Sequence, residues 1–169
     1  MVKHIPNILS IFRVLDLVVV IALMEYNYNY WALFFFILGI LSDILDGHIA
    51  RKTNAVTTIG KIIDPLADKI LVIGVLIAMI KTINIPYWMV IVIVAREFAV
   101  TGLRIVASSE NIIISANQWG KIKTTSQFLA ISALMLNLKT IGIYLLLLAV
   151  IFTIISGYTY FYNYFKATK

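Results

Sequence analysis

The sequence has no cysteine and little charge, and both shortages restrict what the protein can do. With no cysteine among 169 residues, disulfides, thiolate catalysis, cysteine-ligated zinc and iron–sulfur clusters are all excluded. Charged residues make up only 13% of the chain, about half their usual share in soluble domains. The eight acidic residues are therefore scarce enough for each one to be considered individually.

The hydrophobic content explains why charge is scarce. Hydrophobic residues make up 62% of the chain, compared with about 45–50% in soluble domains. A soluble chain of 169 residues has too little interior to bury so much apolar surface, so we expect a bilayer protein. A helical span needs roughly 20 residues, which allows about six spans and leaves no large extramembrane domain. The predicted fold is all-α, a single polytopic transmembrane domain over residues 1–169.

Six apolar segments with short connections support this fold. The connection from Asn137 to Thr140 is short enough for an antiparallel helical hairpin. Pro86, with Asn84 or Ile85 as a cap, is suited to open the fourth helix. Tyr and Trp side chains flank several segments, as in the aromatic belts of membrane interfaces. The expected spans are residues 8–24, 30–48, 61–80, 86–106, 121–138 and 141–162.

Basic residues are distributed unequally between the two predicted sides of the membrane. With the N-terminus in the cytoplasm, twelve Lys and Arg residues belong to the cytoplasmic side and only Lys81 and Lys139 to the other. When Arg13, Lys69 and Arg96, which lie within spans, are left out, the distribution is still nine to two. The positive-inside rule then predicts a multi-pass cell-membrane protein with both termini cytoplasmic. It also accounts for the net charge of +6 without nucleic acid as a partner.

Half of the acidic residues lie within 26 positions, where the second segment ends and the third begins. Asp43 and Asp46 are i,i+3 neighbours, and Asp64 and Asp68 are i,i+4 neighbours, so each pair lies on one helix face. Because the two helices are consecutive and antiparallel, we expect the four carboxylates to converge at the cytoplasmic helix ends.

Four ionised carboxylates in a partly dehydrated site require compensating cations. Carboxylate oxygens suit Mg²⁺, Mn²⁺ or Ca²⁺, and four of them can bridge two ions about 3.5–4 Å apart, as in phosphoryl chemistry. Plain exposure at the interface, or ion pairing with Arg51, Lys61 and Lys69, is the alternative. A divalent-cation transporter is a further alternative, but Glu25 is the only acidic residue that would continue a path to the opposite side.

Small residues accompany these acids. Gly47 and Ala50 follow Asp46, and Gly60 lies one turn before Asp64, where a ligand or a neighbouring helix can approach closely. The whole spacing, D-x2-D-G-x2-A-R-x8-G-x3-D-x3-D, resembles the signature of the CDP-alcohol phosphotransferases. The matching positions are Asp43, Asp46, Gly47, Ala50, Arg51, Gly60, Asp64 and Asp68. The six predicted spans also agree with this family, so the resemblance covers essentially the whole chain.

The resemblance implies an activity and a set of roles. Members of the family transfer a substituted phosphoryl group from a CDP-linked lipid or alcohol to a hydroxyl acceptor and release CMP. It implies that two Mg²⁺ or Mn²⁺ ions are held by Asp43, Asp46, Asp64 and Asp68, and that Asp68 is also the general base. It further implies a homodimer and a CDP pocket lined by Asn7, Arg13, Gly47, Ala50, Arg51 and Gly60. A helix cap for Asn7 and a snorkelling interfacial Arg13 remain as alternatives.

Basic residues in the second half of the chain bear on the acceptor. Arg96, Arg104, Lys121 and Lys123 are suited to form a cationic pocket for a phosphorylated acceptor. Their alternatives are pairing of Arg96 with an acid in the bundle and positive-inside anchoring of the other three. The segments AREFAVTGLR and GKIKTTSQ are similar to those of family members that use CDP-diacylglycerol and sn-glycerol 3-phosphate and produce phosphatidylglycerol phosphate. Inositol phosphate, serine and phosphatidylglycerol remain alternative acceptors.

One residue departs from the family pattern. Asp16 lies in the first segment, where the family usually has an apolar residue. Pairing with Arg13 at i,i+3, or a shortened and tilted helix, are the two explanations that the sequence offers.

Overall fold

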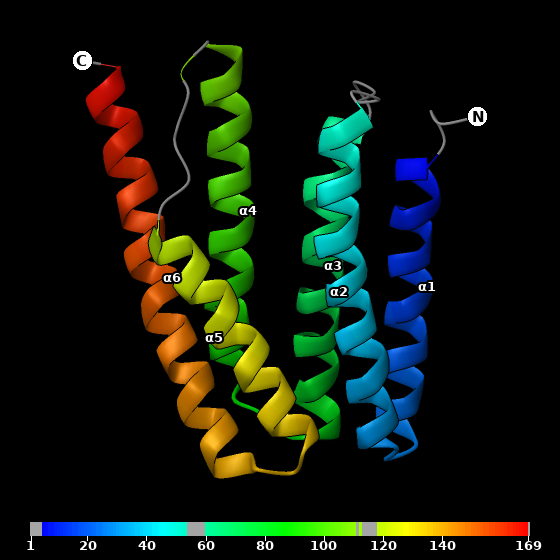
Figure 1. Cartoon of the computed structure of the whole chain (residues 1–169). Coiled ribbons are helices and arrows are strands. Elements are labelled where there is room, and N and C mark those ends of the chain that lie inside the picture. The colour runs from blue at the N-terminus through cyan, green and yellow to red at the C-terminus, as the bar shows by residue number, and fades with distance from the viewer. Residues whose placement is uncertain (1–4, 54–59, 111, 113–117, 169) are drawn as a thin grey trace. The chain divides into compact units, whose positions relative to one another are not determined.

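The computed structural model describes residues 5–53, 60–110, 112 and 118–168, and for residues 5–12, 43–53 and 60–68 it describes the helix but not the side chains. The described residues form six α-helices and no strand (Figure 1). The all-α prediction is therefore confirmed for this part of the chain. The helices are α1 (Ile5–Glu25), α2 (Asn29–Thr53), α3 (Gly60–Thr82), α4 (Tyr87–Ser109), α5 (Gln118–Met135) and α6 (Lys139–Ala167).

Each predicted segment coincides with one helix, but the ends differ. Most helices extend beyond the apolar segments, and α6 continues from the predicted end at 162 to Ala167. The fifth helix is the exception at its C-terminal end, because it stops at Met135 rather than at 138. Pro86 takes the N-cap position with an extended backbone, and the helix begins at Tyr87, one residue later than expected. Hydropathy thus located the helices more accurately than it located their termini.

The chain divides into two compact units, Met1–Asn84 and Ile85–Lys169. In the first unit, α1 packs against both α2 and α3. Asn27 adopts a left-handed backbone (φ 61°) in the turn after α1, and the amide of Tyr28 donates to the carbonyl of Leu23. This ending terminates α1 and returns the chain as α2. The core of this unit contains the fully buried side chains of Val20, Met24, Phe36, Val75, Leu76 and Met79.

In the second unit, α6 packs against both α4 and α5. The predicted hairpin is confirmed: Asn137 is left-handed (φ 61°), and the amide of Leu138 donates to the carbonyl of Ala133. Gly142 lies so close to Leu134 that the two helices touch near the turn. The buried core of this unit contains Ile93, Ile131, Leu134, Met135 and Leu146.

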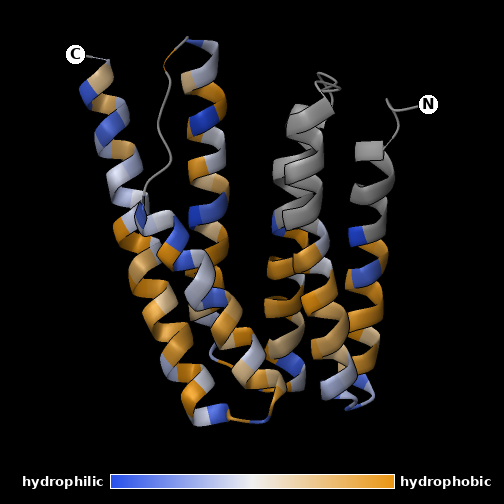
Figure 2. Ribbon diagram, viewed as in Figure 1, coloured by the Kyte–Doolittle hydropathy of each residue, from blue (hydrophilic) through white to orange (hydrophobic). Residues whose placement is uncertain are grey.

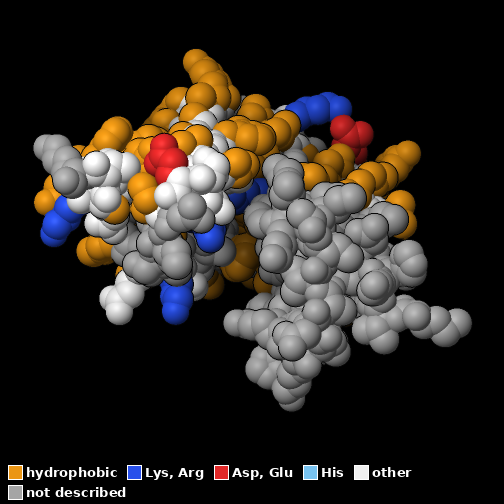
Figure 3. Space-filling model, turned by 90° about the horizontal axis from the view of Figure 1, so that it is seen from above, with side chains coloured by type: hydrophobic (Ala, Val, Ile, Leu, Met, Phe, Trp, Pro, Cys, Tyr) orange, Lys and Arg blue, Asp and Glu red, His pale blue; other side chains and the backbone are white. Residues whose placement is uncertain are grey.

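Large apolar side chains face outward on every helix. Examples with about half of their surface exposed or more are Val18 on α1, Ile77 on α3, Ile105 on α4 and Ile154 on α6. Hydrophobic residues run along the described helices in Figure 2, and they cover much of the described surface in Figure 3. Within the described residues, α6 is long and apolar enough to cross a membrane, and Asn29–Ser42 of α2 is a shorter apolar stretch.

Candidate active site

The predicted metal-binding residues lie on two neighbouring helices of the first unit. Asp43 and Asp46 are on α2, and Asp64 and Asp68 are on α3. The helices α2 and α3 contact each other. The end of α2, the beginning of α3 and the beginning of α1 lie at the same end of this unit (Figure 1). The side chains of all four aspartates lie outside the described residues, so their convergence stays a prediction.

The predicted nucleotide-binding residues belong to the same helices. Gly47, Ala50 and Arg51 are on α2, Gly60 is the first residue of α3, and Asn7 is on α1. Their side chains also lie outside the described part of the structure.

Arg13 is the described member of the predicted nucleotide set. Its side chain is buried on α1 rather than spread over the surface, which differs from the snorkelling alternative. Among the described side chains, no group of three or more His, Asp and Glu is suited to hold a metal ion. Carboxylate oxygens are the ligands that hard divalent ions prefer, and the metal-binding role of the four aspartates of α2 and α3 stays a prediction.

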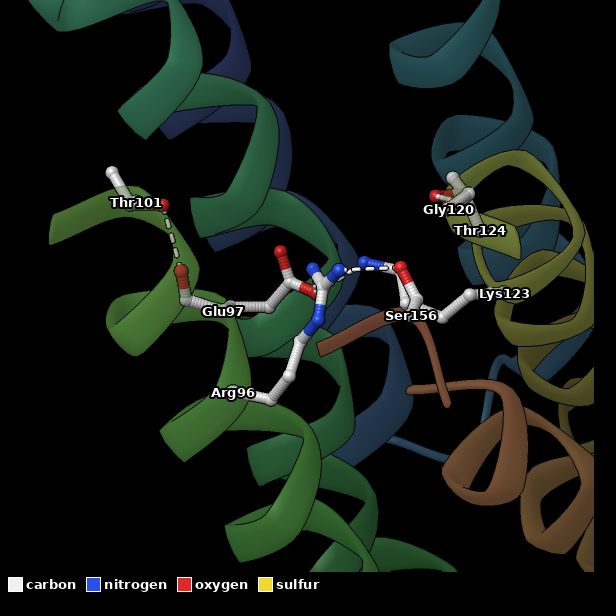
Figure 4. A network of polar contacts seen from close by, with 7 residues as sticks. All are labelled: Arg96, Glu97, Thr101, Gly120, Lys123, Thr124 and Ser156. Atoms are coloured by element: carbon white, nitrogen blue, oxygen red, sulfur yellow. Dashed lines mark hydrogen bonds and ion pairs between the residues drawn. The ribbon is translucent and has the colours of Figure 1, made fainter. Parts of the chain in front are cut away.

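The second unit contains a buried network of charged side chains centred on Glu97 (Figure 4). Glu97 is only 6% exposed, and Lys123 of α5 is only 5% exposed. The Lys123 Nζ atom forms a short ion pair with Glu97 Oε1. The Arg96 Nη1 atom lies 3.2 Å from the same oxygen. One carboxylate oxygen therefore holds both an ammonium and a guanidinium group.

The guanidinium of Arg96 is also held by α6. Its Nη2 atom donates a 2.6 Å hydrogen bond to Ser156 Oγ, and its Cζ atom lies 5.5 Å from the ring centroid of Tyr160. Gly157 leaves the room that this side chain needs, because a Cβ atom there would lie 3.2 Å from Arg96 Cγ. Side chains from α4, α5 and α6 thus belong to one connected network, in which Lys123 contacts Glu97 and Ser156 contacts Arg96.

The charges of the three side chains Arg96, Glu97 and Lys123, counted by themselves, sum to one positive charge in a largely buried position. The Nε atom of Arg96 is buried and has no hydrogen-bond partner among the described residues. A surplus cationic charge with an unused N–H donor is an arrangement that favours an anion. The network is therefore chemically suited to take part in holding a phosphate.

The structure separates the four residues predicted to bind the acceptor phosphate into two pairs. Arg96 and Lys123 share Glu97, which the sequence allowed as an alternative for Arg96. Arg104 and Lys121 have exposed side chains, and within the described residues no contact joins either to Glu97. The phosphate-binding role of all four remains a prediction.

Sequence reasoning missed Glu97, Ser156 and Tyr160 as members of this network. Glu97 had a detectable signal, because it is the only acid in the apolar segment 86–106 and such residues are usually functional or paired. Ser156 and Tyr160 had none, since a serine and a tyrosine in an apolar helix do not reveal which neighbouring helix they face.

Comparison with known proteins adds independent information. The family model described as CDP-alcohol phosphatidyltransferase matches residues 3–155, which include the aspartate motif and the charged residues Arg96, Glu97 and Lys123. A protein of Bacillus subtilis is 45% identical over 141 residues, covering 79% of this chain and 73% of that protein. A protein of Rickettsia typhi is 38% identical over 170 residues, covering 94% of this chain and 96% of that protein. Both are named CDP-diacylglycerol--glycerol-3-phosphate 3-phosphatidyltransferase.

Proposed function

Because the chain belongs to the CDP-alcohol phosphatidyltransferase family, we propose that it transfers the phosphatidyl group of CDP-diacylglycerol to sn-glycerol 3-phosphate. The products are phosphatidylglycerol phosphate and CMP, and the reaction belongs to phospholipid biosynthesis. The observation that carries the proposal is the complete eight-position motif from Asp43 to Asp68, inside the matched region. The names of the Bacillus and Rickettsia relatives support this donor and this acceptor.

The four aspartates of α2 and α3 would hold the divalent ions, Mg²⁺ or Mn²⁺ and two in number. When bound, such ions neutralise the pyrophosphate and stabilise the charge that develops on the leaving CMP. The two aspartate pairs come from consecutive helices that contact each other, which supports their acting together.

The transfer breaks one bond and forms one bond at phosphorus. An acceptor hydroxyl oxygen bonds to the phosphatidyl phosphorus, and the bond from that phosphorus to the CMP oxygen breaks. The hydroxyl proton passes to the carboxylate of Asp68, which acts as the general base. CMP leaves with the electron pair of the broken bond, so atoms and charge balance.

The remaining residues bind and orient the substrates. Gly47, Ala50 and Gly60 have small side chains that allow a nucleotide to approach the helix backbone closely. Arg51, Asn7 and Arg13 complete the CDP subsite. The acceptor phosphate is held by Arg96, Arg104, Lys121 and Lys123, and the surplus positive charge around Glu97 supports the inclusion of Arg96 and Lys123.

The lipid substrate places the protein in the cell membrane. We propose that all six helices span the bilayer, with both termini in the cytoplasm, and that residues 1–169 form one catalytic domain that works as a homodimer. The outward-facing apolar side chains on the described helices support a lipid environment.

A panel of acceptors tests the proposal. Purified protein with Mg²⁺ and CDP-diacylglycerol is expected to release CMP when sn-glycerol 3-phosphate is added. Serine, inositol phosphate and phosphatidylglycerol serve as competing acceptors in parallel reactions. Release of CMP with one of these, and not with glycerol 3-phosphate, would overturn the acceptor and leave the family assignment intact.

A further inference from the structure

We propose that Glu97 is a positioning residue for the acceptor: it fixes Arg96 and Lys123 as a joint cationic pair that receives the acceptor's phosphate. The inference rests on the proposed function, because it concerns the phosphate subsite of that reaction. Glu97 itself does not touch the substrate in this proposal. It acts through the two cations that share its Oε1 atom.

Arg96 and Lys123 are two largely buried cations on different helices, and such charges repel each other strongly where water is excluded. Glu97 Oε1 overcomes this repulsion by accepting from Lys123 Nζ and from Arg96 Nη1 at the same time. Without the negative charge of Glu97, the two cations would lose the carboxylate that they share, in a position where only 7–11% of each side chain is exposed. The two cations would then separate toward solvent.

Arg96 and Glu97 are adjacent in α4, yet their side chains connect to different helices: Arg96 reaches Ser156 on α6, and Glu97 reaches Lys123 on α5 (Figure 4). The guanidinium is thereby held by Ser156 Oγ, by the face of Tyr160 and by Glu97. Three such contacts fix the orientation of the planar guanidinium group. A fixed orientation is needed for a guanidinium to direct its N–H donors at a phosphate.

Arg96 keeps an unused hydrogen-bond donor, because its buried Nε atom has no partner among the described residues. The charges of Arg96, Glu97 and Lys123, counted by themselves, sum to one positive charge. A buried donor left without a partner is unfavourable, so a bound phosphate oxygen would remove that cost. Glu97 thus holds the cations together without neutralising both of them. A neutral acceptor such as glycerol gains little from this arrangement.

Glu97→Gln tests the inference, because the amide keeps the shape of the side chain and removes only its charge. We expect the KM for glycerol 3-phosphate to rise at least about tenfold, equivalent to a loss of roughly 1.4 kcal/mol in binding. The KM for CDP-diacylglycerol is expected to stay within about twofold of the unchanged protein. Glu97→Asp retains the charge and is expected to recover part of the affinity. The inhibition constant of inorganic phosphate, as a competitor of glycerol 3-phosphate, is expected to rise in parallel in Glu97→Gln.

Two further variants separate positioning from a merely structural role. Glu25→Gln makes the same chemical change at an exposed acid whose partner is Lys81, 2.7 Å away, and it is expected to change neither KM.

Ser156→Ala removes the hydrogen bond to Arg96 without breaking an ion pair, so it tests the inference even if Glu97→Gln does not fold. We expect it to raise the KM for glycerol 3-phosphate several-fold with kcat unchanged.

The outcomes are distinguishable. An unchanged KM for glycerol 3-phosphate in folded Glu97→Gln and in Ser156→Ala, or an equal rise in both substrates' KM values, overturns the role of Glu97 and leaves the proposed function standing. Absence of CMP release by the unchanged protein with glycerol 3-phosphate overturns the proposed function and this inference together. A selective rise in the KM for glycerol 3-phosphate supports both.

Discussion

Asp16 of α1 lies directly against Gly39 of α2, so that a Cβ atom on Gly39 would come within 3.0 Å of the Asp16 Oδ2 atom. The same Cβ would also lie 2.8 Å from Leu71 Cδ2 of α3. Asp16 is only 5% exposed, and Oδ2 has no hydrogen-bond partner among the described residues. The acid that departs from the family pattern is thus accommodated by the absence of a side chain on the next helix.

This contact predicts that Gly39→Ala destabilises the protein. The added methyl group would have to displace a buried carboxylate on one side and a buried leucine on the other. Such overpacking typically costs about 1–3 kcal/mol. We expect a lower thermal unfolding midpoint in detergent, followed by the fluorescence of the three tryptophans.

Gly102→Ala is the matched control for this experiment. Gly102 also lies inside a helix, α4, but a Cβ atom there would meet nothing within 4 Å. Alanine favours the helix by up to about 1 kcal/mol over glycine, so this variant is expected to be as stable as the unchanged protein or more stable. If Gly39→Ala behaved in the same way, the close packing of Asp16 on Gly39 would be disproved.

Asp16 itself is expected to tolerate loss of its charge. A buried carboxylate oxygen without a partner bears a desolvation cost that an amide of similar shape largely avoids. Asp16→Asn is therefore expected to unfold at the same temperature as the unchanged protein or at a higher one. A drop of more than about 2 kcal/mol in the free energy of unfolding would instead mean that the ionised form is needed for folding.

The sequence predicted the positions of the helices well because a bilayer protein marks its helices by long apolar runs. It predicted their ends less well, because polar residues such as those after 48 in α2 and after 162 in α6 remain helical where no apolar side chain marks them. The aspartate motif could be recognised because local spacing fixes which residues share a helix face. The pairing of Arg96 with Ser156 could not be predicted from the sequence, since it depends on how α4 packs against α6.

Asp68→Asn is expected to abolish turnover while the protein still folds and inserts. Loss of a general base typically lowers the rate by about 100-fold to 10,000-fold. CMP release with CDP-diacylglycerol and glycerol 3-phosphate measures the effect, and circular dichroism of the purified variant checks the helical content. Asp16→Asn makes the same chemical change in the same unit and is expected to retain activity. More than about a tenth of the normal rate in Asp68→Asn would contradict the role as general base.

Removal of divalent ions is expected to stop the same reaction. A chelator that removes Mg²⁺ and Mn²⁺ should reduce CMP release to background, because the four aspartates would then face the pyrophosphate without compensating charge. Adding back Mg²⁺ or Mn²⁺ in excess should restore the rate. Undiminished activity in the chelator would contradict a metal-dependent transfer by these aspartates.

The proposed topology can be tested by labelling single introduced cysteines, because the chain has no cysteine of its own that would react. Single cysteines at Tyr28 and Leu138 lie in the turns after α1 and after α5, and both side chains are exposed. Six spans with cytoplasmic termini place these two positions outside the cell. We therefore expect a membrane-impermeant maleimide to label them in intact cells.

Single cysteines at Ser109 and Thr168, at the C-terminal ends of α4 and α6, provide the opposite case. Both positions are exposed, and the proposed topology places them in the cytoplasm, so labelling should require permeabilised cells. Leu138 and Thr168 flank α6, so labelling of both from the same side would show that this helix does not cross the membrane. Labelling of Thr168 in intact cells with protection of Leu138 would mean that α6 crosses in the reverse direction, and the positive-inside orientation would then be wrong.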